Sequence, residues 1–293
     1  MILLILVLSF FAFCAFIATA VNVLYRHSEK EILRREQPHE SYRWYAQMPK
    51  ETYTVSGYAD YPLHTEYLPA EGESDRFIII VHGYAYNRLG SLKYAELFHK
   101  HGFHCIIYDN RGHGLNRKTY CTFGIRESRD LMAVIEDTYR RYGPDIHIGL
   151  HGESMGTGTV LALLQYQPNI DFAVCDCGFG DLEPVLKNKL WQNMRAPAWL
   201  LKPVSAVNRL LYGFSYRKVK PIQYLPDNRI PLCFMHGTAD DYIDVSQSKA
   251  MYEANGGYGE LHLYPGAGHA MALLSDPARY ETELFEFVEE VPG

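Results

Sequence analysis

Residues 146–165 read IHIGLHGESMGTGTVLALLQ, and this stretch decides the fold. It opens with an apolar run over residues 146–150, which is typical of a strand buried on both faces of a sheet. The turn Gly152-Glu153-Ser154-Met155-Gly156 follows, and residues 155–165 are then apolar over a length that suits a helix. The sequence therefore predicts a strand, a sharp turn and a helix, with Ser154 at the tip of the turn.

The turn has the pattern G-x-S-x-G, in which glycines flank the serine on both sides. Residues without side chains at these positions allow the strand and the helix to approach closely. Between a strand and a helix the pattern indicates a nucleophile elbow, which exposes the serine hydroxyl at the C-terminal edge of a sheet. The alternative is a plain glycine-rich turn whose serine caps the helix. We predict that Ser154 is a nucleophile.

Strands and helices are expected to alternate on both sides of this unit. Apolar runs predict buried strands at residues 77–81, 104–108, 172–175, 232–235 and 261–264, and helices are expected near residues 89–101, 126–142, 245–254 and 277–290. Two short runs rich in Tyr, Thr and Val within residues 51–69 predict an antiparallel hairpin at the sheet edge. This alternation predicts an α/β protein with a mostly parallel, doubly wound sheet and helices on both faces.

The alternation lapses over residues 178–229, which are rich in proline, leucine and tryptophan. We expect short helices that form a lid insert over the catalytic edge of the sheet. Side chains that would form walls for an acyl or aromatic group are Trp191, Trp199, Leu200, Leu201, Leu210 and Leu211. Ordinary packing onto the core is the alternative for each of them.

Residues 2–25 carry no charged side chain and are long enough, at about 1.5 Å per residue, to span about 30 Å of hydrocarbon. Positive side chains follow them, which places this flank in the cytoplasm by the positive-inside rule. We therefore expect an uncleaved transmembrane anchor over residues 1–25, a linker over residues 26–50 and a cytoplasmic domain over residues 51–293. The alternative is a signal peptide that is cleaved near Ala20, which would lead to secretion.

The protein has 293 residues, of which 47% are hydrophobic and 21% charged, an ordinary composition for a globular protein. A formal net charge of −6 and the lack of a long basic run argue against nucleic acid as a partner. The six cysteines show no zinc or redox spacing, and most lie in apolar runs where a thiol is buried. We expect neither a metal nor a cofactor, and reduced thiols favour the cytoplasm.

A serine hydroxyl is a weak nucleophile until a base accepts its proton. On this kind of fold the expected chain order is serine, acid and histidine, and only His262 and His269 lie beyond the candidate acids. His262 lies within a predicted strand, whereas His269 lies on a glycine-rich loop after that strand. We predict that His269 is the base, the alternative being a loop histidine that caps the last helix.

The acid and the oxyanion hole are expected on neighbouring loops. Carboxylates that could orient the base are Asp240, Asp241 and Asp244 after one strand and Asp176 after another, and spacing alone does not choose among them. The backbone N–H groups of Met155 and Tyr84 are the expected donors to the oxyanion. His82 precedes the nucleophile in the chain, so we expect a structural role for it.

Five short motifs resemble, in order, the landmark motifs of the α/β-hydrolase superfamily over residues 50–293. They are His82-Gly83, Asp109-x-Arg111-Gly112-His113-Gly114, Gly152-x-Ser154-Met155-Gly156, His236-Gly237-x-x-Asp240 and Gly266-x-Gly268-His269. The chain looks most like bacterial membrane-anchored hydrolases related to serine esterases and monoacylglycerol-lipase-like enzymes. The resemblance implies that Asp240 is the acid of the triad. The chain departs from the family at Asp244, where proline is frequent.

The sequence therefore predicts a serine hydrolase that cleaves carboxylic esters, with lipid-like or other acyl esters as small-molecule substrates, through an acyl-enzyme intermediate. Its one further partner is the membrane, through residues 2–25. A serine peptidase or amidase on the same fold is one alternative. A non-catalytic membrane-anchored binding protein is another, although a chain freed from catalysis has no need of Ser154, Asp240 and His269 together.

Overall fold

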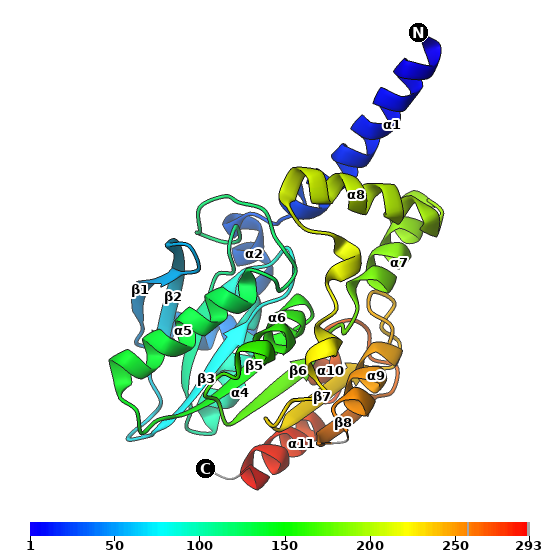
Figure 1. Ribbon diagram of the computed structural model, residues 1–293. Helices are drawn as coiled ribbons and strands as arrows, with labels where there is room; N and C mark the ends of the chain where they lie inside the picture. Colours follow the sequence, from blue (N-terminus) through cyan, green and yellow to red (C-terminus); the bar gives the residue numbers. More distant parts are fainter. Residues whose placement is uncertain (257, 292–293) are drawn as a thin grey trace.

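A computed structural model describes residues 1–256 and 258–291, and an eight-stranded sheet forms its centre (Figure 1). The strand order is β1-β2-β4-β3-β5-β6-β7-β8, in which β2 runs antiparallel to β1 and β4 and the other neighbours are parallel. The strands are β1 Glu51–Gly57, β2 Tyr61–Leu68, β3 Arg76–Val81, β4 His104–Tyr108, β5 His147–Glu153, β6 Phe172–Asp176, β7 Leu232–Gly237 and β8 Gly259–Tyr264. The predicted mostly parallel sheet and its edge hairpin are confirmed.

Helices cover both faces of this sheet. On one face lie α4 Leu92–Lys100, α10 Ala272–Ser275 and α11 Pro277–Glu290, and on the other lie α5 Glu127–Tyr142, α6 Met155–Leu163 and α9 Ser246–Ala254. Successive side chains of β3 point to opposite faces of the sheet. Ile78 and Ile80 pack toward α4, whereas Ile79 and Val81 pack toward α5 and α6. Because both faces are buried, the strand is a continuous apolar run.

The insert over residues 178–229 lies beyond the C-terminal ends of the parallel strands (Figure 1). Its two helices are α7 Leu182–Met194 and α8 Leu201–Tyr212, joined and followed by short 3-10 turns. The Asp181 carboxylate accepts a hydrogen bond from the Glu183 N–H and so caps α7, while Gly213, at φ +80°, ends α8. Buried residues of the insert pack against Phe123 and Met155 of the main domain.

The N-terminal segment forms helix α1 Ile2–Thr19, which continues as a π-helical turn over Ala20–Leu24. These 23 residues form one helix that is long and apolar enough to cross a membrane, a test that a signal sequence also passes. The helix is therefore either a membrane anchor or a signal sequence. It packs against α8 at its base, and its N-terminal part stands clear of the domain (Figure 1).

Residues 26–50 differ from the predicted linker, because they form two short helices, α2 Glu29–Glu36 and α3 Glu40–Gln47, that pack on the core. Both helices contain charged residues, yet Ile32 of α2 and Ser41 and Tyr45 of α3 are buried. The Tyr45 hydroxyl also donates a hydrogen bond of 2.7 Å to Glu66. Helices of eight residues are too short for a periodic apolar pattern to predict this packing from the sequence.

Candidate active site

Ser154 lies between β5 and α6 with φ +56° and ψ −110°, a conformation that strains any residue other than glycine. Gly152 and Gly156 flank Ser154, and neither position has room for a side chain. A Cβ atom at Gly152 would lie 2.6 Å from the Thr157 nitrogen, and one at Gly156 would lie 2.0 Å from the Val81 carbonyl oxygen. The predicted close approach of strand and helix around Ser154 is therefore present.

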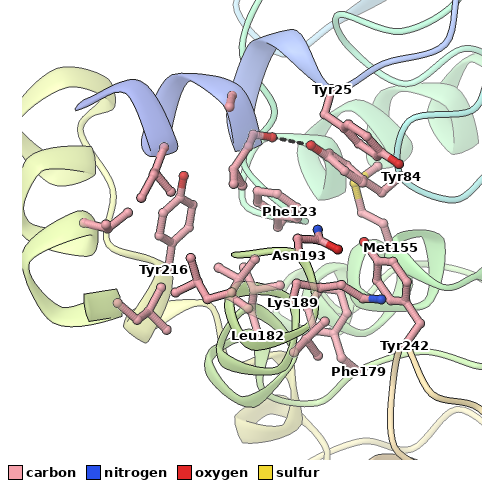
Figure 2. A pocket seen from close by; sticks show the side chains of 18 of the residues that line it. Tyr25, Tyr84, Phe123, Met155, Phe179, Leu182, Lys189, Asn193, Tyr216 and Tyr242 are labelled. Atoms are coloured by element: carbon pink, nitrogen blue, oxygen red, sulfur yellow. Dashed lines mark hydrogen bonds between the residues drawn. The ribbon is translucent and has the colours of Figure 1, made fainter. Parts of the chain in front are cut away.

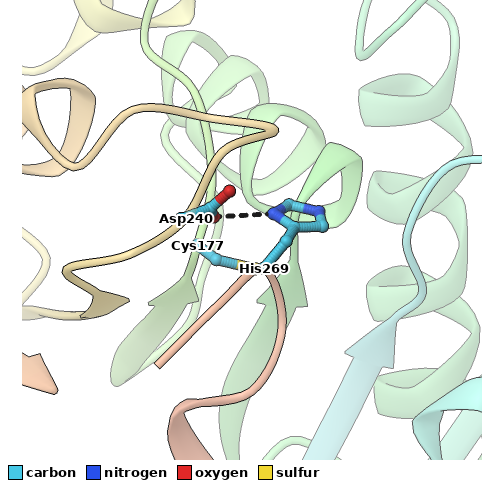
Figure 3. Close-up of side chains that lie close together, drawn as sticks. All are labelled: Cys177, Asp240 and His269. Atoms are coloured by element: carbon cyan, nitrogen blue, oxygen red, sulfur yellow. Dashed lines mark hydrogen bonds and ion pairs between the residues drawn. The ribbon is translucent and has the colours of Figure 1, made fainter. Parts of the chain in front are cut away.

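Three loops that follow parallel strands bring Ser154, His269 and Asp240 together. The Ser154 Oγ lies 3.0 Å from His269 Nε2. His269 Nδ1 lies 2.7 Å from Asp240 Oδ2, as Figure 3 shows. With the proton on Nδ1, the imidazole donates to the carboxylate, and its Nε2 is free to accept the serine proton. The carboxyl ends of parallel strands meet at one edge of the sheet, so residues far apart in sequence become neighbours here.

The Asp240 carboxylate is buried and fully hydrogen-bonded. Its Oδ1 accepts the backbone N–H groups of Tyr242 and Ile243, both at 2.8 Å, while His236 lies 3.2 Å from Oδ2. Burial by itself would raise the pKa of Asp240, but the hydrogen bonds from His236 and His269 outweigh it and hold that pKa well below its ordinary value. Asp240 therefore stays ionised beside His269.

The other carboxylates that the sequence offered lie elsewhere. Asp241 is exposed, and Asp244 accepts a hydrogen bond from the Ser246 N–H at the start of α9. Asp176 is buried beneath the elbow, where its Oδ2 accepts from the hydroxyls of Tyr94 and Tyr280 at 3.0 and 2.9 Å. None of the three has a recorded hydrogen bond to His269, whereas Asp240 does.

A partly buried ion pair that sequence reasoning missed lies beside the elbow and borders a cleft at Ser154. Lys93 of α4 lies 2.8 Å from Glu153, the residue before the nucleophile, and Tyr94 donates to the same carboxylate at 2.9 Å. Burial opposes ionisation of Glu153, but Lys93 outweighs it and lowers the pKa of the carboxyl. Nothing in the sequence marks Lys93, because it reaches Glu153 only through the packing of α4 on β5.

The two expected oxyanion donors both adjoin Ser154. Met155 is the first residue of α6, so its N–H is one of the helix amides that have no partner within the helix. Tyr84 follows Gly83, and a Cβ atom at Gly83 would lie only 3.5 Å from the Ser154 Cβ. The buried His82 is held by its own surroundings, since its Nε2 accepts the Asn110 N–H at 2.9 Å.

An apolar cavity of about 460 Å³ opens beside Ser154 (Figure 2). Its walls come from the insert, from the loops around Phe123 and Tyr242, and from the N-terminal helix. Residues of the N-terminal segment that line it are Phe16, Ile17, Ala20, Val21 and Tyr25. Among the described lining residues, Lys189 alone carries a formal charge, and its Nζ lies 3.6 Å from the centre of the Tyr242 ring.

The structure does not place Trp191 and Trp199, the predicted substrate-site tryptophans, at the cavity beside Ser154. Their side chains are 55% and 60% exposed, and neither borders the cavity. Helix α7 turns Leu186 and Leu190, four residues apart, toward the cavity, so the adjacent Trp191 points away from it. Of the four leucines predicted beside them, Leu201 alone lines the cavity; Leu200 is buried in the insert, and Leu210 and Leu211 are exposed.

A second cleft of about 410 Å³ also borders Ser154, and we term it the polar cleft because its lining is more polar than that of the apolar cavity. His269 borders this cleft and not the apolar cavity. The histidine, lysine and glutamate side chains that line it are His27, Glu36, His39, Lys93, Glu153 and His269. Ser154 thus borders both an apolar space and a polar one.

Cys177, Asp240 and His269 also place three potential metal-ligand atoms within 4.8 Å of one another (Figure 3). Burial raises the pKa of the Cys177 thiol well above its ordinary value, and the neutral thiol is a poor ligand. Asp240 and His269 are already bonded to each other. The donor set therefore fits an acid–base pair better than a metal centre.

Comparison with known proteins places this site in a family. The Hydrolase_4 family, described as serine aminopeptidase, S33, matches residues 72–218, which is half of the chain. The chain is also 30% identical over 285 residues to the uncharacterized protein YqkD of Bacillus subtilis (strain 168), covering 93% of each sequence. The protein therefore belongs to the S33-like family of α/β hydrolases, which is related to esterases and peptidases.

Solved structures share the fold at low identity. An esterase of Pyrococcus furiosus, Pf2001, is 23% identical with a TM-score of 0.71, and the match covers 84% of this chain and 92% of that one. An esterase of Exiguobacterium antarcticum is 16% identical with a TM-score of 0.61 over 82% of this chain and all of that one. The acylaminoacyl peptidase of Pyrococcus horikoshii is 18% identical with a TM-score of 0.64, over 83% of this chain and 42% of that one. These similarities establish the α/β-hydrolase fold.

Proposed function

We propose that the protein is a serine hydrolase that cleaves carboxylic esters with an apolar acyl group. The observation that carries the proposal is the chain of contacts from Ser154 to His269 at 3.0 Å and from His269 to Asp240 at 2.7 Å, beside an apolar cavity. A nucleophile bonded to a base, which a carboxylate orients in turn, is the arrangement that acyl transfer requires.

In the proposed reaction, Ser154 Oγ attacks the acyl carbonyl carbon while His269 Nε2 accepts the serine proton. The oxyanion that forms accepts hydrogen bonds from the N–H groups of Tyr84 and Met155. The bond to the alcohol oxygen then breaks as His269 returns the proton to that oxygen, which leaves the acyl group on Ser154. Water follows the same route and releases the carboxylic acid.

The two spaces beside Ser154 support an assignment for each part of the substrate. His269 borders the polar cleft, and the group that His269 protonates must leave on that side. The apolar cavity then holds the acyl chain, and its volume of about 460 Å³ lies within the range of about 300–1,000 Å³ that is usual for small-molecule sites. An ester of an apolar acid with a polar alcohol fits this division.

A serine peptidase is the second candidate, because the family description names an aminopeptidase. An aminopeptidase must bind the ammonium group of its substrate close to the scissile bond, for which a carboxylate is the natural partner. In an aminopeptidase substrate the ammonium group belongs to the acyl part, and the described lining residues of the apolar cavity, which is assigned to that part, include no Asp or Glu. Glu36 and Glu153, the latter paired with Lys93, lie in the polar cleft instead. These observations favour the ester.

Helix α1 is proposed to be an uncleaved membrane anchor with the domain in the cytoplasm. Residues beyond Ala20 are locked into the fold: Asn22 is buried and bonded to Asn208, and the Arg26 guanidinium donates to the carbonyls of Gly112 and Thr119. Cleavage near Ala20 would remove Phe16 and Ile17 from the cavity wall. A segment that completes the cavity is better retained than removed.

The test compares p-nitrophenyl esters and p-nitroanilides of the same acids, from acetyl to lauroyl, with the full-length protein in detergent. We expect turnover of the esters that rises with acyl length, and anilide turnover at least 100-fold lower. Preference for anilides would establish the peptidase instead. If neither series reacts, the protein is better explained as a binding protein that has kept the fold.

A further inference from the structure

The outer surface of the insert is apolar in a way that the catalytic cavity does not explain. Four large, exposed side chains that do not line the cavity form what we term the insert face: Trp191, Trp199, Leu210 and Leu211. Leu210 is the most exposed of them, at 73%. Several large apolar side chains exposed on one insert are typical of an interaction site.

The insert face lies beside the base of the N-terminal helix. Helix α8 packs against α1, and the hydroxyls of Thr19 and Tyr212 lie 2.8 Å apart where the two helices meet. Figure 1 shows α8 lying across the foot of α1, from which the rest of α1 leads away from the domain. The insert face is therefore continuous with the apolar surface of α1.

The charge of the insert is opposite in sign to that of the whole protein. The chain has a net charge of −6, whereas the insert, residues 178–229, contains nine basic residues and three acidic ones. Lys187 and Arg217 pair with Glu183, and Lys220 pairs with Asp181. The other basic residues of the insert are Lys189, Arg195, Lys202, Arg209, Lys218 and Arg229. On α8, Lys202, Arg209 and Leu210 are all exposed and share one helical stripe. Cations beside exposed apolar side chains are typical of a surface that binds anionic lipid.

The length of α1 also indicates that the insert face contacts the membrane. Its exposed part, residues 2–13, spans about 18 Å at about 1.5 Å per residue, whereas the hydrocarbon core of a bilayer is about 30 Å thick. The missing length lies in residues 14–24, where Cys14, Ile17 and Ala18 are buried against the insert. If α1 spans the bilayer, the foot of α1 and the neighbouring α8 must lie within the membrane surface.

We propose that the insert face docks on the anionic leaflet from which α1 emerges, with α8 along the membrane surface, and that the cavity receives its acyl chain from that leaflet. Trp199 and Trp191 lie at the level of the headgroups, while Lys202 and Arg209 extend toward lipid phosphates. Phe16 lines the cavity and is also 63% exposed, so it stands at the mouth of the cavity on the side of α1. This assignment of the substrate source rests on the proposed ester hydrolysis.

The test uses tryptophan fluorescence of the full-length protein in phosphatidylglycerol-containing vesicles with lipids brominated at different depths. Pairwise Trp→Phe variants leave one tryptophan at a time, and Trp44 is the matched control. Trp44 packs on His99 at the opposite edge of the sheet, with ring centroids 5.2 Å apart. We expect shallow bromines to quench Trp199 and Trp191 at least twofold more than Trp44. Quenching of all three to the same small extent would overturn the docking.

A charge-reversal pair tests the role of anionic lipid. Lys202→Glu with Arg209→Glu is expected to lower turnover of a vesicle-embedded ester about fivefold or more and to leave p-nitrophenyl acetate turnover unchanged. Lys100→Glu with Arg140→Glu makes the same change of net charge on α4 and α5 and is expected to alter neither. Equal losses in the two pairs would contradict the proposal.

The outcomes separate the two proposals, because quenching does not require turnover. Quenched Trp199 in a protein that hydrolyses no ester would leave the docking intact and refute the proposed reaction. Hydrolysis of p-nitrophenyl acetate without quenching of Trp199 would refute the docking alone.

Discussion

The loops that follow β5, β7 and β8 and the insert over residues 178–229 differ in how the sequence encodes them. Ser154, Asp240 and His269 each follow the C-terminal end of a parallel strand, so sheet topology alone gathers them at one edge. The insert is positioned by packing against α1, which lies more than 150 residues earlier in the chain. Local motifs thus define the reactive groups, whereas long-range packing shapes the space for the substrate.

If this division holds, changes in the strand-end loops should remove activity on every substrate. Asp240→Asn is expected to lower kcat about 10⁴-fold, because an amide does not hold the imidazole in the productive tautomer. The fold loss should be the same for acetate and laurate esters. Asp241→Asn, at the exposed neighbouring position, is the control and should stay within twofold of the wild type; a comparable loss there would displace Asp240 as the acid.

The ionised Asp240 carboxylate should also contribute to the free energy of unfolding. Because the pKa of Asp240 in the folded protein is depressed below its ordinary value of 3.8, its contribution is present above pH 3.8 and is lost as the pH falls further. We expect Asp240→Asn to lose roughly 1.5–3 kcal/mol of unfolding free energy at pH 7, with the gap to the wild type narrowing below pH 3.8. Denaturant unfolding at pH 7, 5 and 3 measures this, and a gap that does not change with pH would argue against the ionised carboxylate.

Changes in the insert should instead alter the preference of the enzyme for the length of the acyl chain. Leu186→Trp fills part of the cavity and is expected to lower laurate hydrolysis roughly tenfold while acetate hydrolysis changes little. The control is Trp191→Leu on the outward face of the same helix, which makes the reverse exchange of leucine and tryptophan. It should leave the hydrolysis rates of both esters within twofold of the wild type. Initial rates on the two esters suffice. A uniform loss for Leu186→Trp would mean that the cavity does not hold the acyl chain.

Much of the fold was predictable because its strands are buried on both faces. The run at residues 77–81 has no polar position, and that is how a central parallel strand differs from a half-exposed one. The close approach at Gly152 and Gly156 was predictable for a similar reason, since a glycine on each side of a serine after a strand has a steric meaning.

The walls of the cavity were not predictable from the sequence. Leu190 and Trp191 are adjacent on a helix whose apolar residues do not fall on one face. Which side of α7 faces the cavity is therefore set only by the elements that pack against the helix. Phe16 and Ala20 belong to a stretch whose composition is that of any membrane span. Their place beside Ser154 depends on contacts such as the Tyr84 hydroxyl donating to the Val21 carbonyl, which leave no pattern in the chain.

The most direct test of the central claim is the hydrolysis of p-nitrophenyl esters by the wild type and by Ser154→Ala, with fluorophosphonate labelling of both. The account predicts that kcat falls by about 10⁶-fold in the variant and that labelling of the wild type is lost with it. Ester turnover that survives the substitution within tenfold, or labelling that persists at another residue, would contradict the assignment of Ser154 as the nucleophile.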